Sequence, residues 1–196
     1  NLTDATQNAD PFVEVSGIFK ACASNLLKVA SDLRLLSSGP DAGFGDIKLP
    51  PRQAGSSIMP GKVNPVIPEA VSQAAIQVMS NDQTIAIACS LGNLELNAFM
   101  PLIADALLGS LDLLRNACSI FTRFCVVGIE PNEERTRQQV QGATATVTAL
   151  VERLGYEKSQ AAAAKASAEG RAVREVVVEM GLLTGEEFDE LTSPEA

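Results

Sequence analysis

A short stretch of the chain, residues 55–65, gathers side chains that could bind and activate a small anion. It reads GSSIMPGKVNP and joins two segments with helical patterns. Lys62 supplies a compact cation for a carboxylate, and Asn64 can donate and accept hydrogen bonds at once. Ser56 and Ser57 can donate or accept protons, while the glycines let backbone N–H groups turn toward an anion. We expect a mobile lid that closes over a small anionic substrate.

Two other interpretations of this stretch compete with a substrate lid. A phosphate-binding P-loop is disfavoured, because five residues separate Gly55 from Gly61 and Val63 stands where Ser or Thr should bind magnesium. A solvated linker remains open on composition alone. For Glu69, just beyond the stretch, spacing alone favours a first-turn carboxylate stabilised by a helix dipole over a functional role.

The composition favours packed helices and excludes several classes of protein. Hydrophobic residues make up 46% of the chain but aromatic residues only 4%, and Trp is absent. A net charge of −9 provides no basic face, so we expect no nucleic-acid partner. No apolar run reaches the roughly 18 residues that a membrane span needs, and the N-terminus has no signal-peptide pattern. We therefore expect a cytoplasmic protein with no membrane partner.

The cysteine and histidine content limits the kinds of reactive site that this chain can form. Four cysteines lie in apolar helical contexts without a C-x-x-C pair, and we expect buried free thiols rather than disulfides: Cys22, Cys89, Cys118 and Cys125. The chain has no histidine. We therefore expect no metal site, and no Ser-His or Cys-His nucleophile within this chain.

Helical spacing of apolar residues predicts three long helices. The first follows Asp10, a capping carboxylate, with Pro11 at the first helical position, and ends near residue 36. The second runs from Pro68 to about residue 90, and the third covers about 94–125, with Pro101 kinking or restarting its first turn. Such lengths are typical of a helical bundle whose surface is covered by other subunits.

The pattern breaks at residues 126–131, and only short helices are predicted beyond it. Thr184 followed by Glu187 forms a capping box for the last of them. We predict an all-α fold with two parts. Residues 1–131 form a bundle that carries the 55–65 stretch, and residues 132–196 form a small helical domain.

Residues 55–65 match, residue for residue, the signature loop of the aspartase/fumarase superfamily. Three further segments resemble the same family, namely 33–40 (LRLLSSGP), 95–97 (ELN) and 174–177 (REVV). The resemblance extends over nearly the whole chain and disfavours the linker interpretation. It implies a homotetramer built around a twenty-helix bundle, with each active site assembled from three subunits.

The resemblance also implies elimination of ammonia or water from a four-carbon amino or hydroxy acid, giving fumarate without a cofactor. By this likeness Ser56 is the base that removes the Cβ proton, and Ser57 contacts a substrate carboxylate. Lys62 and Asn64 hold the other carboxylate, with Val63 between them lining the site. Glu69 belongs to a supporting network, where the family pairs it with a histidine from another segment.

The two branches of the family are harder to separate. Residues 66–69 (VIPE) resemble aspartases, 125–132 (CVVGIEPN) resemble fumarases, and Phe99-Met100 departs from both. We favour the aspartase branch because 66–69 follow the signature directly. The family's early bundle helices and histidine motif have no counterpart here. We therefore expect these residues to be a C-terminal portion of the enzyme that is inactive alone.

Overall fold

The computed structural model describes residues 1–39, 42–53, 62–142 and 146–193, and for residues 141 and 142 it describes the backbone alone. It divides into two compact units, Asn1–Pro131 and Asn132–Ala196. Among the described residues, regular structure is helical apart from two strands of two residues each. The predicted all-α class, long helices followed by short ones, is confirmed.

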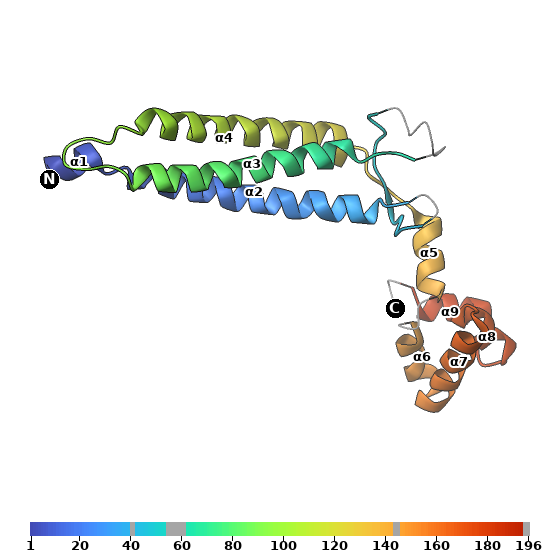
Figure 1. The fold of residues 1–196 in the computed structure, drawn as a ribbon. Coiled ribbons are helices and arrows are strands. Elements are labelled where there is room, and N and C mark those ends of the chain that lie inside the picture. Colours follow the sequence, from blue (N-terminus) through green and yellow to red (C-terminus); the bar gives the residue numbers. More distant parts are fainter. Residues whose placement is uncertain (40–41, 54–61, 143–145, 194–196) are drawn as a thin grey trace. The chain divides into compact units, whose positions relative to one another are not determined.

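The first unit consists mainly of three long helices that lie side by side and run in alternating directions (Figure 1). They are α2 (Asp10–Leu36), α3 (Val66–Cys89) and α4 (Met100–Phe121). A short helix α1 (Leu2–Gln7) precedes them, and a π-helical turn η1 (Thr122–Val126) continues α4. Strands β1 (Ile47–Lys48) and β2 (Glu130–Pro131) pair antiparallel, with Ile47 opposite Pro131.

Small residues at heptad spacing let these helices approach closely. On α2 the buried positions are Ser16, Ala23 and Ala30, which recur every seven residues. The buried stripes of α3 and α4 advance by steps of three or four residues, the spacing of coiled-coil-like packing: Val71, Ala75, Val78, Asp82 and Ile85 on α3, and Ile103, Ala106, Ser110, Leu114, Ala117 and Phe121 on α4. No helix in the described ranges is both long and apolar enough to cross a bilayer.

The starts of all three long helices differ from their predicted positions, and α3 begins at Val66, two residues before the predicted Pro68. Ala9 is the N-cap of α2 and Asp10 is its first residue, so the predicted Asp10 cap is wrong. Helix α4 begins at Met100, not near residue 94. Asn97 explains this difference, because its side chain donates to the Ala88 carbonyl at 3.2 Å and accepts from the Phe99 amide at 2.9 Å. These bonds stabilise a non-helical turn between α3 and α4.

The prediction that all four cysteines are buried is wrong in part. Cys125 is buried, Cys89 is half-buried, and Cys22 and Cys118 are exposed on the surface of this chain. Both exposed thiols lie on long helices, where apolar neighbours in sequence do not by themselves place a residue on the packed face.

Among its described residues, the second unit contains five short helices, and the last four of them surround a core of their own. They are α5 (Glu133–Gly142), α6 (Thr146–Leu154), α7 (Tyr156–Glu169), α8 (Val173–Glu179) and α9 (Gly185–Leu191). Phe188 is fully buried and packs with Leu150, Ala162 and three valines of α8, Val173, Val176 and Val177. Thr184 and Glu187 form a reciprocal capping box at the start of α9, and this prediction is confirmed.

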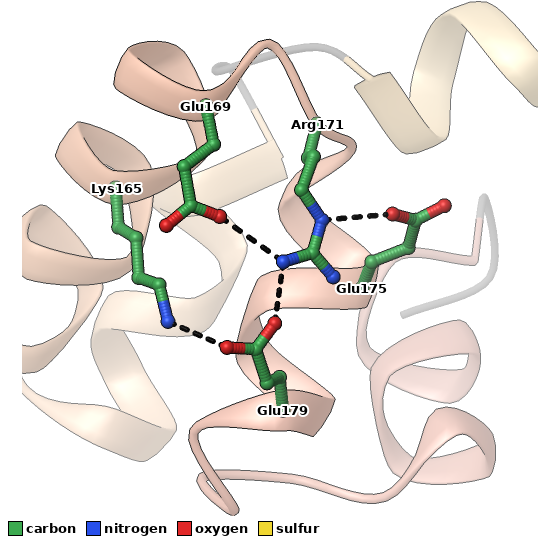
Figure 2. Close-up of polar contacts among 5 residues, drawn as sticks. All are labelled: Lys165, Glu169, Arg171, Glu175 and Glu179. Atoms are coloured by element: carbon green, nitrogen blue, oxygen red, sulfur yellow. Dashed lines mark hydrogen bonds and ion pairs between the residues drawn. The ribbon is translucent and has the colours of Figure 1, made fainter.

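Charged side chains cross-link α7 and α8 on the surface of the second unit (Figure 2). Arg171 donates to Glu169, Glu175 and Glu179, and Lys165 donates to Glu179 at 2.7 Å. The hydrogen bonds from Lys165 and Arg171 lower the pKa of Glu179 to about 2. All five side chains are partly exposed, so we interpret the network as a solvated structural cross-link rather than a reactive site.

The segment 174–177 also has a structural explanation. Arg174 donates two hydrogen bonds of 2.8 Å to the two carboxylate oxygens of Asp189, which joins α8 to α9. This pairing raises the pKa of Arg174 and lowers that of Asp189. A bidentate pair of this kind holds both side chains in one geometry.

Candidate functional site

The described end of the signature motif, residues 62–65, leads directly into α3. The Asn64 carbonyl accepts from the Val66 amide at 2.9 Å, and the Pro65 carbonyl accepts from the Glu69 amide at 3.1 Å. These bonds start the helix and fix the backbone of Asn64 against its first turn. The proposed residues Ser56 and Ser57 lie outside the described residues.

The three described motif residues differ in exposure. Lys62 and Asn64 are half-buried, whereas Val63 is 45% exposed. In the part of the chain that the structure describes, Lys62 pairs with no carboxylate.

Asn64 lines a small pocket that is partly open to solvent. The chain before the motif contributes Arg52, the chain after it contributes Pro68, and η1 contributes Phe124 and Cys125. Burial raises the pKa of the Cys125 thiol, so this cysteine stays protonated at neutral pH and is a poor nucleophile.

Glu69 lies in the first turn of α3, as predicted, and faces the last turn of α2. The Arg34 guanidinium lies 3.8 Å from its carboxylate, with side chains 45% and 42% exposed. The dipole explanation for Glu69 and a role in a supporting network are both compatible with this position.

Sequence reasoning missed the roles of two arginines near the site. Arg34 belongs to the 33–40 segment, but its pairing with Glu69 bridges 35 positions and has no local signal. Arg52 donates to the Phe124 carbonyl at 3.0 Å and lies 5.2 Å from the centre of the Phe124 ring. In the sequence, the only sign of a role for Arg52 is its position as a cation three residues before Gly55. Within the described ranges, no three His, Cys, Asp or Glu side chains gather as metal ligands would.

Two family models match the chain. The model described as "Lyase" matches residues 1–80, and the model described as "Fumarase C C-terminus" matches residues 147–196. The first covers α2 and the signature motif, and the second covers most of the small unit.

Individual proteins of two activities match at similar levels. The chain is 46% identical to "Aspartate ammonia-lyase" of Bacillus subtilis over 194 residues, covering 99% of this chain and 41% of that protein. It is 48% identical to "Fumarate hydratase class II" of Thermosynechococcus vestitus over 180 residues, covering 92% of this chain and 38% of that protein. The chain thus spans about two fifths of the length of the curated relatives it matches.

A solved structure has the same fold. The native form of "fumarate lyase:delta crystallin" from Brucella melitensis matches with a TM-score of 0.88 and 46% identity, covering 99% of this chain and 44% of that one. Helical architecture, motif and similarity together define a lyase-type protein. The chain belongs to the fumarase/aspartase superfamily, as the sequence resemblance predicted.

Proposed function

We propose that the protein is a cofactor-independent carbon–nitrogen lyase that converts L-aspartate reversibly to fumarate and ammonia. The observation that carries the proposal is the complete 55–65 motif, whose described end leads into the N-terminus of α3. A structural role alone would require neither its serines nor its lysine.

Lys62 and Asn64 would bind one substrate carboxylate. Lys62 supplies a cation without a carboxylate partner in the described part of the chain, and a charged hydrogen bond shielded from water contributes about 1.5–3 kcal/mol. The N-terminus of α3 adds positive potential, because the helix dipole favours anions there. Val63 would line the site between them.

Ser56 would remove the Cβ proton of the substrate. The electron pair of the C–H bond moves into the adjacent carboxylate, forming a doubly charged aci-carboxylate. Its return forms the carbon–carbon double bond and expels the amino group, which leaves as ammonia. Lys62, Ser57 and backbone amides would stabilise the dianion as it forms, and Lys62 would also favour the serine alkoxide.

Glu69 would support the site from the first turn of α3. In this proposal its carboxylate belongs to a charged network that includes Arg34 and a histidine from another segment. The network would orient groups around the substrate rather than contact the reacting atoms.

We propose a homotetramer with shared active sites. Large apolar side chains on the long helices are exposed in this chain alone, including Ile18 at 68%, Leu108 at 62% and Leu35 at 55%. Burying such residues against other subunits would remove apolar surface from water. A cytoplasmic location is part of the proposal, since free thiols persist in reducing compartments.

Hydration of fumarate is the second candidate activity. Sequence identity to the class II fumarate hydratase, 48%, is close to the 46% identity to the aspartate ammonia-lyase, and the motif suits either leaving group. A non-enzymatic scaffold of the same fold is the remaining alternative.

The test is fumarate formation by the full-length protein, followed by absorbance, with L-aspartate and L-malate in parallel. The expected result is fumarate from L-aspartate and none from L-malate. Fumarate from malate alone would establish the hydratase alternative. No fumarate from either substrate would favour the scaffold.

A further inference from the structure

The end of α4 offers a backbone acceptor beside the signature motif. There the α-helix widens into the π-helical turn η1, and the chain becomes extended at Val127. The last carbonyls of a helix have no amide ahead of them within the helix. Phe124 is one of these residues, and its carbonyl accepts the hydrogen bond from Arg52 Nε at 3.0 Å.

The chain that precedes the motif is held on this helix end by three contacts. Strand β1 pairs with β2, just beyond η1. Pro50 lies so close to Gly128 that an added Cβ would be 3.1 Å from the proline ring. Arg52 makes the third contact, through its hydrogen bond and its position over the Phe124 ring.

The chain that follows the motif packs on the same helix end. Leu49 from before the motif and Ile67 from after it both pack against the buried cluster that contains Phe121 and Cys125. Asn64 lines the same pocket as Arg52 and Phe124. Both sides of the motif therefore converge on one turn of helix.

We propose that Arg52 is a positioning residue for the substrate-binding end of the motif. By donating to the Phe124 carbonyl, it fixes the preceding chain on η1 and so determines where Asn64 lies. Arg52 itself need not contact the substrate. The link to substrate binding rests on the proposed function, whereas the effect on the backbone around Asn64 does not.

Hydrogen exchange in the full-length protein tests the structural half of this proposal. The peptide covering residues 62–69 contains the Val66 and Glu69 amides, which bond to the motif's own carbonyls. Arg52→Leu should make this peptide exchange at least about threefold faster, as expected for loss of one hydrogen bond. A peptide from within α4, residues 103–114, reports whether the bundle remains folded and should be unchanged.

Two further variants separate the hydrogen bond from the charge. The side-chain amide nitrogen of Gln lies the same number of bonds from the backbone as Nε of Arg. Arg52→Gln should therefore keep the hydrogen bond and the slow exchange without a cation. Arg123→Leu removes the other guanidinium near the Phe124 ring, 5.3 Å from its centre, and should leave exchange unchanged. Unchanged exchange in Arg52→Leu, or a Gln variant that behaves like Leu, would overturn the proposal.

Steady-state kinetics with L-aspartate or L-malate test the link to substrate binding. Arg52→Leu should raise KM about three- to tenfold while kcat changes less than about twofold, because binding geometry is affected more than proton transfer. Arg52→Gln should recover most of the loss. Equal loss of kcat in both variants would overturn the positioning role. If the unaltered protein forms no fumarate, the proposed function fails, and hydrogen exchange alone decides the role of Arg52.

Discussion

Ser16 on α2 donates a 2.6 Å hydrogen bond to the buried carboxylate of Asp82 on α3, which also accepts from Lys20 at 2.6 Å. Burial raises the pKa of Asp82, but the hydrogen bonds from Lys20 and Ser16 outweigh it and hold the pKa below its ordinary value. The ionised carboxylate is therefore a specific link between the two helices.

Asp82→Ala should lower the free energy of unfolding by about 1–3 kcal/mol, because the buried Ser16 hydroxyl loses its acceptor. Urea unfolding at pH 7 measures this loss. The difference should shrink as the pH falls below the ordinary Asp value of about 3.9, since protonation removes the charged contribution in that range. Asp112→Ala is the matched control, because Asp112 is 65% exposed and its ion pair with Arg115 lies on the surface. Equal losses in the two variants would contradict the structure.

Thr184→Ala should destabilise the second unit by about 1 kcal/mol, the usual cost of losing a helix cap. The Thr184 hydroxyl accepts from the Glu187 amide at 3.2 Å, and the Glu187 carboxylate accepts from the Thr184 amide at 2.8 Å. Thr184→Ser keeps the hydroxyl and should remain within a few tenths of a kcal/mol of the original. Thermal unfolding of the three proteins provides the comparison, and a Ser variant as unstable as Ala would be inconsistent with a capping role.

Glu179→Gln should lower the melting temperature at pH 7 and lose that effect in acid. The folded-state pKa of about 2 lies below the unfolded value of about 4.3, so the ionised carboxyl stabilises the fold above pH of about 4.3. That contribution disappears as the pH falls toward 2, and added salt should weaken it. Glu190→Gln, an exposed carboxylate on α9, is the control and should show little change. A Glu179 effect that persists at pH 2 would contradict the low pKa.

Ser56→Ala and Lys62→Ala should affect the proposed reaction differently. Loss of a general base lowers kcat by roughly 10²–10⁴-fold. Loss of the carboxylate-binding cation should also raise KM, because Lys62 contacts the substrate in the ground state as well. Steady-state fumarate production by the full-length protein measures both constants, with the exposed Ser80→Ala as the control. Near-normal kcat in Ser56→Ala would remove Ser56 from its proposed role.

The existence of the three long helices followed from local patterns. Apolar residues at three- and four-residue steps identify the packed face of each helix without knowledge of its partners. The same reasoning placed the start of α4 too early, because residues 94–97 continue the apolar spacing. Asn97 ends α3 through bonds to carbonyls eight and nine residues back, and its importance appears only when those carbonyls are located.

By itself, the sequence determined the helical class, the capping box at Thr184 and the motif that places the chain in its family. These three features depend on residues that are close together in the sequence or on an unbroken run of specific residues. Only the tertiary structure decided that Asp82 is buried between α2 and α3, and that Arg52 binds the Phe124 carbonyl 72 positions away. A charged side chain is normally expected at the surface. Its actual position depends on hydrogen-bond partners that folding brings together from distant parts of the chain.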